Sequence, residues 1–381
     1  MMGWTMKKIL IVNNNLDMGG IQKSLINLLL EIHNRYDITL LLFSKSGALL
    51  KDVPPNVKVI TPAKCYKVLG LTKEELKKYP FLYFAKAFLL KYASVFSRRS
   101  AMNLLGIFQK RITGYDFVIS YSHLPDHKYF SNGCGDFVLD KTISDNKICL
   151  IHCDYLNSCY MTEKNNAQYA EFDKIACCSD SVKERFVQGS AIDRSKVYTL
   201  RNFYDLRIGE LAVDCPHVYD DNYINVVSVA RLSSEKGIDR GITALANSKR
   251  TDIRYYVIGD GPKRNDLVAQ VKEYRFEEQV FFLGEQKNPY RYMVNADCLL
   301  VPSVHEAAPM VFDEATILGL PVLTTNTTSA MEMIGIEYGQ VFDNSLEGIV
   351  LVLSELPKGA SKNYQPKTNE LQREQFVKLI Y

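Results

Sequence analysis

The chain has 381 residues, of which 47% are hydrophobic and 23% are charged. Because domains commonly contain about 100–200 residues, this length and composition predict an ordinary globular protein of two domains. The net charge of +3 argues against a nucleic-acid-binding protein, which usually presents a strongly basic face.

The cysteines and the N-terminus indicate a cytoplasmic protein. The chain holds nine cysteines, an odd number, and the apolar run in MMGWTMKKILIV is too short for a secretory signal. We therefore expect reduced thiols and a cytoplasmic location. No apolar run reaches the roughly 18 residues of a transmembrane helix. Cys149, His152, Cys153 and Cys159 lie close in sequence, but without paired C-x-x-C knuckles they favour a strand entering a loop over a zinc site.

Short apolar runs that are typical of buried strands alternate with helical segments along nearly the whole chain. The expected strands are Lys8–Asn13, Ile38–Phe43, Val57–Ile60, Phe117–Tyr121, Ile148–His152, Lys174–Cys177, Val197–Leu200, Ile224–Val229, Tyr255–Ile258, Val280–Leu283, Cys298–Pro302 and Pro321–Thr324. The clearest helical segments are Ile21–His33, Ser181–Gln188, Pro262–Tyr274 and Pro309–Leu318. Strands that are buried on both faces and separated by helices predict parallel sheets covered by helices.

This alternation starts twice, which predicts two domains. The segment Leu206–Asn222 is polar and irregular, and a new strand opens after it. The expected fold class is therefore α/β, with two doubly wound, Rossmann-like domains that face each other across a cleft. We place the N-terminal domain at residues 1–205, a linker at 206–222 and the C-terminal domain at 223–360.

One segment, Lys77–Arg99, departs from the alternation. It is rich in Phe, Tyr and Leu, is interrupted by Lys86 and Lys91, and ends in two arginines. One interpretation is a helix that lies in a membrane interface and attracts anionic lipid. The other is a helix that packs on its own domain and leaves its lysines in solvent. The sequence leaves both open.

The second half of the chain has two glycine- and cation-bearing loops at strand ends, where open α/β sheets bind ligands. In SVARLSSEKGIDR, Arg231 follows the strand Ile224–Val229 and Lys236 precedes the next helix. Two cations in this position are suited to a diphosphate, although a plain surface loop has the same composition. In VIGDGPKR, Gly259 and Gly261 frame a tight turn. Such turns need glycine for backbone reasons, so this motif is weak evidence for a ligand.

The third loop, in VPSVHEAAPMVFDEATILGLPVLTT, carries Glu306 and Glu314 where a buried strand gives way to a helix. Pro309 suits the first helical turn, and the helix N-terminus offers an anion site. If the segment were helical throughout, the two carboxylates would lie roughly 12 Å apart along the axis, wider than the roughly 5–9.5 Å of a glycosidase pair. That reach suits a nucleotide sugar. In the plain alternative, Glu306 ends a loop and Glu314 solvates a helix face.

Four motifs in order resemble the C-terminal domain of the family 4 glycosyltransferases, which have the two-Rossmann-domain GT-B architecture. They are VVSVARLSSEKGID, YYVIGDGPKR, VFFLGEQKNPYRYMVNADCLLVPS and HEAAPMVFDEATILGLPVLTT, within about residues 224–334. The N-terminal half agrees more weakly, through GGIQKSLINLL, IHCDY and FDKIACCSDSVKERF followed by TLRNFYD. The architecture also implies that a helix within residues 361–381 crosses back to the first domain.

The resemblance implies a role for each matching position. Arg231 and Lys236 would hold the donor diphosphate and stabilise the leaving nucleotide, Glu314 would bind the ribose hydroxyls, and Glu306 and His152 would lie beside the donor sugar. These four residues, Arg231, Lys236, Glu306 and His152, are the expected catalytic group. The remaining donor-binding positions are expected to act through backbone groups or close backbone approach: Gly19, Gly20, Gly259, Gly284, Ala308, Met310 and Val311.

The implied activity is sugar transfer from a nucleotide sugar, with a UDP-sugar as the expected donor, to a glycan or lipid-linked acceptor of polysaccharide biosynthesis. Retention of anomeric configuration is implied by the family. No D-x-D occurs in the chain, so no carboxylate pair is evident to hold a divalent metal. Leaving-group stabilisation would then fall to Arg231, Lys236 and a helix N-terminus. The expected location is cytoplasmic, with peripheral contact at the cytoplasmic face of a membrane.

The sequence also departs from the family pattern. Ala307 follows Glu306 where the family commonly has glycine, Asn326 stands where an Asp often occurs, and Ser329–Glu332 lacks the usual glycine before its acid. The alternatives are a non-catalytic sugar-nucleotide-binding subunit, which Ala307 leaves open, and a GT-B-fold epimerase, for which we find no acid/base carboxylate pair in the N-terminal half. An NAD-dependent dehydrogenase is disfavoured because GGIQKS is not G-x-G-x-x-G.

Overall fold

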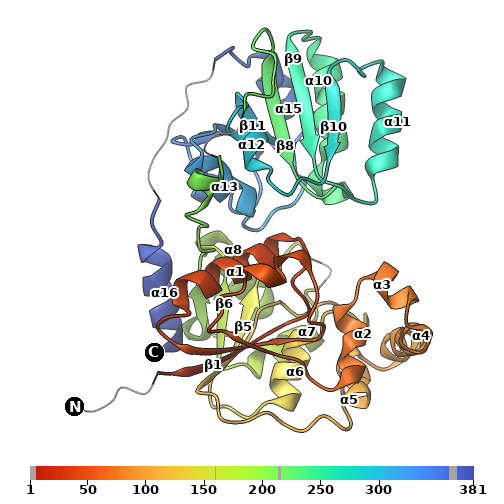
Figure 1. The fold of residues 1–381 in the computed structure, drawn as a ribbon, viewed down its shortest axis with the longest axis vertical. Helices are drawn as coiled ribbons and strands as arrows, with labels where there is room; N and C mark the ends of the chain where they lie inside the picture. The colour runs from red at the N-terminus through yellow and green to blue at the C-terminus, as the bar shows by residue number, and fades with distance from the viewer. Residues whose placement is uncertain (1–5, 159, 213–215, 360–366) are drawn as a thin grey trace. The chain divides into compact units, whose positions relative to one another are not determined.

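The computed structural model describes residues 6–158, 160–212, 216–359 and 367–381. The chain forms two compact units (Figure 1). The N-terminal unit comprises Met1–Phe203 and Asn369–Tyr381, and the C-terminal unit comprises Tyr204–Thr368. Each unit is built on one parallel sheet.

The N-terminal unit has a seven-stranded parallel sheet in the order β3-β2-β1-β4-β5-β6-β7. Its strands are β1 (Lys8–Asn13), β2 (Asp37–Leu42), β3 (Lys58–Ile60), β4 (Phe117–Ser120), β5 (Lys147–Ile151), β6 (Lys174–Cys177) and β7 (Val197–Thr199). Ile9 pairs with Ile38 of β2 on one side and with Phe117 of β4 on the other. The strand order therefore reverses between β1 and β4, which places a ligand-binding switch point at their carboxyl ends.

Helices cover both faces of this sheet, because its central strands carry apolar side chains on both faces and these must be buried. The helices of the N-terminal unit are α1 (Gly20–Ile32), α2 (Lys67–Gly70), α3 (Lys73–Lys77), α4 (Pro80–Val95), α5 (Arg98–Leu105), α6 (Cys134–Lys141), α7 (Glu163–Ala170), α8 (Asp180–Ser190) and α16 (Glu370–Ile380). Ser97, Thr162 and Ser179 accept a backbone N–H as N-caps of α5, α7 and α8. Apolar side chains of α1 and α16 share one core cluster with the strands.

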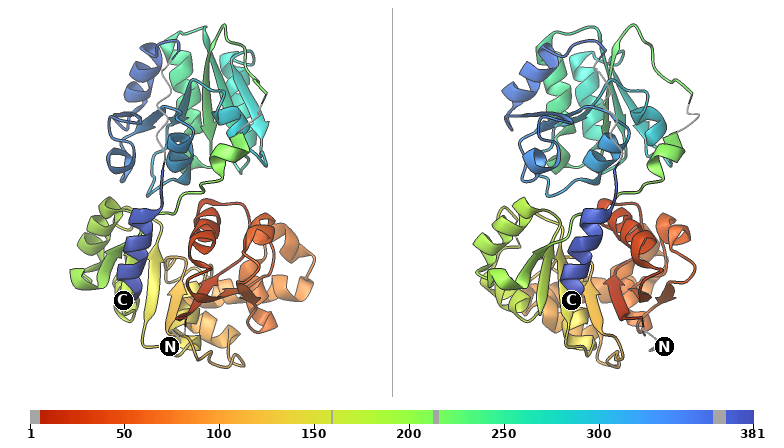
Figure 2. Two further views of the ribbon diagram at one scale, coloured as in Figure 1. Left: turned by 60° about the vertical axis from the view of Figure 1, so that its left-hand side comes forward. Right: turned by 90° about the vertical axis from the view of Figure 1, so that its left-hand side faces the viewer.

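The C-terminal helix α16 belongs to the N-terminal unit, beside its strands in both views of Figure 2. Lys174 Nζ donates to the Leu379 carbonyl at 2.7 Å, and Arg373 forms an ion pair with Glu31 of α1 at 2.5 Å. Phe376 is buried against Tyr36, with ring centroids 5.7 Å apart. The helix lies in the segment 361–381 that we expected to return to the first domain; residues 360–366 lie outside the described part of the chain.

The C-terminal unit has a six-stranded parallel sheet in the order β10-β9-β8-β11-β12-β13. Its strands are β8 (Ile224–Val229), β9 (Ile253–Ile258), β10 (Val280–Gly284), β11 (Cys298–Val301), β12 (Val322–Thr325) and β13 (Gly339–Phe342). Its helices are α9 (Ile208–Ala212), α10 (Ile238–Ser248), α11 (Arg264–Tyr274), α12 (Tyr290–Met293), α13 (Met310–Ile317), α14 (Ala330–Met333) and α15 (Leu346–Ser354). The order reverses between β8 and β11, which gives this unit its own switch point.

Two elements differ from the sequence-based expectation. The edge strand β13 was not expected, because its residues GQVF are only partly buried and form no continuous apolar run. The described part of segment 206–222, expected to be a linker, instead packs on the C-terminal unit. Ile208 and Ala212 of α9, one helical turn apart, are buried in its core together with Tyr219.

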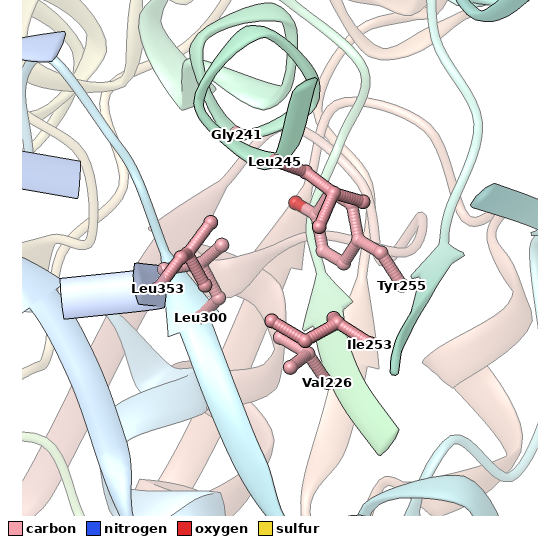
Figure 3. A pocket seen from close by; sticks show the side chains of 7 residues that line it. All are labelled: Val226, Gly241, Leu245, Ile253, Tyr255, Leu300 and Leu353. Carbon is pink, nitrogen blue, oxygen red and sulfur yellow. The ribbon is translucent and has the colours of Figure 1, made fainter. Parts of the chain in front are cut away.

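A small gap lies within the core of the C-terminal unit (Figure 3). Apolar side chains including Val226, Leu300 and Leu353 line it, and it has no room for a water molecule. The Tyr255 hydroxyl at its edge hydrogen-bonds with Ser228 Oγ at 2.8 Å. The gap is therefore a packing feature of the core and not a ligand site.

Helix α4 is attached to the N-terminal unit by few of its residues. Only Leu89 and Ala93 of its sixteen residues are buried, whereas Phe81, Phe84 and Phe88 are 83%, 72% and 60% exposed. The interpretation in which the helix packs on its own domain therefore holds for only one narrow face of α4, the face that carries Leu89 and Ala93. Among the described residues, no helix combines the length and the apolar character needed to cross a membrane.

The two arginines at the end of the segment Lys77–Arg99, which follow α4, are held by acids of the same unit. Arg98 is buried, and its Nε lies 2.7 Å from Asp136 Oδ2 while its Nη2 donates to Gln168 at 2.7 Å. Arg99 forms ion pairs with Asp140 at 2.7 Å and with Glu171 at 2.5 Å. These cations fix α5 to α6 and α7.

We predict that Asp136→Ala lowers the free energy of unfolding by about 3–5 kcal/mol, because it leaves the Arg98 charge buried without its carboxylate. Urea unfolding followed by circular dichroism measures the change. Glu184→Ala is the matched control, since its partner Arg194 lies at the exposed surface, and it is expected to change stability little. Equal losses in the two variants would contradict the structural role of Arg98.

Candidate functional site

The loops that follow β8 and β11 form the switch point of the C-terminal unit. The two strands are neighbours, with Cys298 opposite Val226 and Leu299 opposite Val227. Because both run in the same direction, their carboxyl ends meet at one edge of the sheet. The loop after β8 carries Arg231 and Lys236, and the loop after β11 carries Glu306. The sheet therefore brings together the two loops that the sequence singled out.

Lys236 and Glu306 form an ion pair between these two loops. Lys236 Nζ lies 2.6 Å from Glu306 Oε1, and Ser303 Oγ donates to the same oxygen at 2.8 Å. The Glu306 side chain is 9% exposed and that of Lys236 is 25% exposed, so the pair is partly shielded from solvent screening. A carboxylate that accepts from both a cation and a hydroxyl is held in one place, which fixes Lys236 Nζ at the end of the strands.

The backbone brings Lys236 into this position. The short helix η4 (Ser234–Lys236) ends at Gly237, whose φ of +63° is in the left-handed region. A Cβ on Gly237 would lie 2.1 Å from the Pro302 carbonyl oxygen, so only glycine allows the two loops to approach this closely. The Val304 amide also donates to the Glu235 carbonyl at 2.9 Å. The K-G dipeptide is therefore the local sequence cause of the ion pair.

Arg231 lies on the same loop with an exposed side chain, and it forms no ion pair with a described residue. Its loop rests on the Gly259–Gly261 turn, where the Leu232 amide donates to the Asp260 carbonyl at 3.0 Å. A Cβ on Gly259 would lie 1.9 Å from the Ala230 carbonyl oxygen, and one on Gly261 would lie 2.4 Å from that of Leu232. The two glycines thus let two backbones pack together, which positions Arg231.

The loop after β11 leads into the N-terminus of α13. Pro309 is the N-cap residue and not the first helical residue, and no side chain caps the helix. The amides of Met310 and Val311 therefore belong to the first turn of a helix, where N–H groups have no partner within the helix. Ala308 lies just before this turn. The structure thus contains the helix N-terminus that the sequence predicted as an anion site.

Glu314 is buried on α13, with 4% of its surface exposed. The Tyr290 hydroxyl donates to Glu314 Oε1 at 3.4 Å, and burial together with the nearby Glu314 charge raises the Tyr290 pKa, so the phenol stays protonated. The plain alternative, in which Glu314 solvates a helix face, is therefore wrong. Glu306 precedes the helix, so the estimate that assumed helix throughout does not apply to this pair.

Two further positions of the predicted site depend on backbone conformation. Gly284 ends β10 with a φ of +68°, and its carbonyl accepts from the Gly259 amide at 2.8 Å. Ala307 has a negative φ, a conformation that any residue adopts. The methyl group at Ala307 therefore causes no backbone strain.

The predicted residues of the N-terminal unit gather at the switch point between β1 and β4. Gly19 is the N-cap of α1 and Gly20 its first residue. His152 follows β5, and its ring lies 5.2 Å from that of Tyr121. The Tyr121 hydroxyl in turn hydrogen-bonds with Ser24 of α1 at 2.9 Å. His152 is thus connected to α1, the helix that follows the glycine loop (Gly19 and Gly20).

His152 is a neutral imidazole. Burial lowers its pKa to about 3, and the neighbouring His123 adds to this effect. Burial and Arg98 likewise lower the pKa of His123 to about 4. The Nε2 atom of His152 is buried and accepts or donates no hydrogen bond within the described residues. At neutral pH it can offer a hydrogen bond but no positive charge.

Sequence reasoning missed the residues that orient the predicted ones. Ser303 lies three residues before Glu306. This short spacing could have predicted a hydrogen bond between the two side chains within one loop. Tyr290 and Tyr121 contact their partners through the tertiary fold, so no local pattern marks them. Within the described residues, no three His, Cys, Asp or Glu side chains cluster as metal ligands would; Cys159, considered above, lies outside them.

Comparisons with known proteins agree with this geometry. Residues 216–353 match the family described as Glycosyl transferases group 1. The chain is 33% identical, over 44% of its length and 45% of the relative's, to a Campylobacter jejuni enzyme named N-acetylgalactosamine-N,N'-diacetylbacillosaminyl-diphospho-undecaprenol 4-alpha-N-acetylgalactosaminyltransferase. It is 36% identical, over 30% of its length and 31% of the relative's, to the O-antigen biosynthesis glycosyltransferase WclY of Escherichia coli. These matches span less than half of either relative.

Among solved structures, the chain is similar to HepE of Anabaena in complex with UDP and glucose. The TM-score is 0.65 at 18% identity, over 99% of this chain and 97% of that one. At this identity the likeness shows the fold alone. With the two parallel sheets, it confirms the expected fold class of two Rossmann-like domains of GT-B type.

The neutral state of His152 predicts how stability depends on pH. Folding lowers the pKa of His152 from 6.5 to about 3. As the pH falls, this imidazole is therefore protonated in the unfolded chain before it is protonated in the folded protein. The free energy of unfolding should therefore fall as the pH drops below about 6.5 and should be unaffected above it. We expect His152→Gln to lose less Tm between about pH 7 and about pH 5 than the unsubstituted protein does. His305→Gln, on an exposed loop, should lose as much as the unsubstituted protein, and equal losses in both variants would contradict a buried neutral His152.

Proposed function

Because residues 216–353 form a Glycosyl transferases group 1 domain, we propose that this protein transfers a sugar from a nucleotide-sugar donor to a glycan or lipid-linked acceptor, with retention of anomeric configuration and without a metal. The observation that carries the proposal is the Lys236–Glu306 ion pair at the switch point of the C-terminal unit. It places a cation and an acid where a doubly wound sheet binds its ligand.

In this proposal the donor diphosphate binds between Arg231, Lys236 and the N-terminus of α13. Lys236 Nζ carries several N–H donors, so it can keep its bond to Glu306 and donate to a phosphate oxygen as well. Arg231 adds a guanidinium fork that suits phosphate oxygens. The amides of Met310 and Val311 contribute partial positive charge without any side-chain rearrangement. Together these groups stabilise the charge that develops when the nucleotide leaves.

Glu314 is assigned to the ribose and Glu306 to the donor sugar. A buried carboxylate whose position is set by a protonated tyrosine can accept hydrogen bonds from two neighbouring hydroxyls. The backbone groups of Gly284 and its neighbours would hydrogen-bond with the nucleobase. In the N-terminal unit, Gly19 and Gly20 would allow close approach of phosphate, and the neutral His152 would hydrogen-bond with a sugar hydroxyl.

The relatives guide the choice of substrates. The HepE structure holds UDP and glucose, which supports a UDP-sugar as the donor here. The Campylobacter jejuni relative is named for a sugar-bearing diphospho-undecaprenol acceptor, and the Escherichia coli relative is named for O-antigen biosynthesis. We therefore assign this chain to the assembly of a surface polysaccharide on a lipid-linked or glycan acceptor.

We further propose that α4 holds the protein at the cytoplasmic face of a membrane. Phe81, Phe84 and Phe88 recur at helical spacing on one exposed face, which we call the α4 aromatic face. Lys77 and Lys91 flank it with exposed side chains. Exposed aromatic residues bordered by lysines are typical of a helix that lies in a membrane interface.

Substitution of the ion pair tests the proposed activity. Lys236→Ala should lower kcat for sugar transfer from a UDP-sugar by roughly 100–1,000-fold, as the loss of one preorganised group for developing charge does. Glu306→Gln should keep UDP binding but lose transfer, because Lys236 remains while the acid is gone. Lys272→Ala, an exposed lysine of the same unit, is the control and should keep full activity. Transfer is measured as UDP release, and full activity of Lys236→Ala would contradict the proposal.

Cosedimentation with vesicles tests the membrane contact. The triple variant Phe81→Ser, Phe84→Ser and Phe88→Ser should lose binding to vesicles that contain phosphatidylglycerol, because it removes the buried apolar area of the bound state. The double variant Ile336→Ser and Leu351→Ser removes equally exposed apolar side chains from the C-terminal unit and should still bind. If the triple variant binds like the unsubstituted protein, α4 is not the membrane contact.

A further inference from the structure

A basic pocket of about 400 Å³ lies in the N-terminal unit, and Gly19, Gly20 and His152 are not among the residues that line it. Its lining residues follow the carboxyl ends of β2 and β3 and continue through α2 and α3 to Tyr79. In Figure 1 these helices, together with α4 and α5, extend from one side of the unit. The pocket therefore lies at the carboxyl edge of the sheet, where such sheets bind ligands. It is on the side of β2 and β3, the last two strands at one end of the sheet.

The pocket has a strong positive charge. Lys45, Lys64, Lys67 and Lys78 line it with a single acid, Glu75, so its formal charge is +3. None of these lysines forms an ion pair with a carboxylate among the described residues. The four lysines leave an excess of positive charge around one hollow, which attracts anions to it. The arrangement favours a ligand with more than one negative charge.

The single acid of the pocket, Glu75, and the ring of Tyr79 are already engaged. Glu75 Oε2 accepts from the Thr72 amide at 3.0 Å, as the capping box of α3. Lys67 Nζ lies 3.2 Å from the Tyr79 hydroxyl and 4.4 Å from its ring centroid. Glu75 is thus occupied with the helix end, and the Tyr79 ring holds one ammonium group at the pocket wall.

The pocket wall is fastened to the loop that follows β1. Asn15 Nδ2 donates to the Gly70 carbonyl at 2.7 Å, at the end of α2. A Cβ on Gly70 would lie 2.4 Å from the Ser44 amide nitrogen, so α2 packs directly on the loop after β2. The same β1 loop continues to Gly19. A ligand in the pocket would therefore lie at the same edge of the sheet as the glycine loop, within the same unit.

We propose that this pocket binds the phosphate or diphosphate group of an anionic acceptor. The assignment rests on the proposed transferase function, and it names the part of the protein that would recognise the acceptor. The donor diphosphate has its own cations in the C-terminal unit, so the lysines here are available to a second anion. Tyr79 immediately precedes α4, whose α4 aromatic face suits the apolar part of a lipid-linked acceptor.

Binding of inorganic pyrophosphate and of farnesyl diphosphate tests the proposal by calorimetry, with the donor site saturated by UDP. The pocket variant is Lys64→Gln with Lys67→Gln, and the control is Lys51→Gln with Lys128→Gln, two exposed lysines of the same unit outside the pocket. We expect roughly tenfold weaker binding for each charge-assisted hydrogen bond that the pocket variant loses. The control variant should bind both probes like the unsubstituted protein.

Each other outcome overturns the proposal in a distinct way. Unchanged binding by the pocket variant would mean that the lysines take no part, and equal weakening in the control would mean that only the general surface charge matters. Lysine-dependent binding to vesicles of phosphatidylglycerol, with no binding of either soluble diphosphate, would assign the lysines to phospholipid headgroups. The UDP affinity is measured in the same samples, so a failure of the donor site is separately visible.

Discussion

The reversal of strand order between β8 and β11 is the constraint on which the candidate donor site depends. Two adjacent parallel strands end at the same edge while their connections leave in opposite directions, so the two loops bound a ligand site. The left-handed backbone of Gly237 then lets the first loop contact Pro302 of the second. Lys236 reaches Glu306 only because both conditions hold. A single methyl group at Gly237 would separate the two loops.

The ion pair also explains how a concentrated positive charge is tolerated before a ligand binds. Glu306 neutralises Lys236. Arg231 lies in solvent, where an unpaired guanidinium costs little free energy because water solvates it. In the proposed function, the arriving diphosphate would therefore meet one exposed cation, one restrained cation and a helix N-terminus. The restrained cation does not need to reorganise at the moment when charge develops, which is the feature that makes electrostatic stabilisation effective. The pocket of the N-terminal unit differs, because none of its four lysines forms an ion pair with a carboxylate among the described residues.

The sequence predicted the elements whose signal is local. Short apolar runs identified strands such as β1 and β8 with their observed bounds, and Arg231, Lys236 and Glu306 were singled out because they follow such strands. The rest depends on contacts between distant residues. Glu314 accepts a hydrogen bond from Tyr290 of another helix. The partner of Arg98, Asp136, lies 38 residues away, so no local pattern reveals that ion pair. The basic pocket joins lysines that are spread along the chain from Lys45 onward, which no periodicity reveals.

The most direct test of the account is a thermal-shift panel of UDP-, GDP- and ADP-sugars, measured without added metal and again with EDTA. The account predicts that one nucleotide series, expected to be the UDP-sugars, raises Tm by the same amount with and without EDTA. The shift should disappear in a variant that combines Arg231→Ala and Lys236→Ala, because binding stabilises the folded state only while the site is intact. The absence of any shift, or a shift that EDTA abolishes, would contradict a metal-free donor site built from these residues.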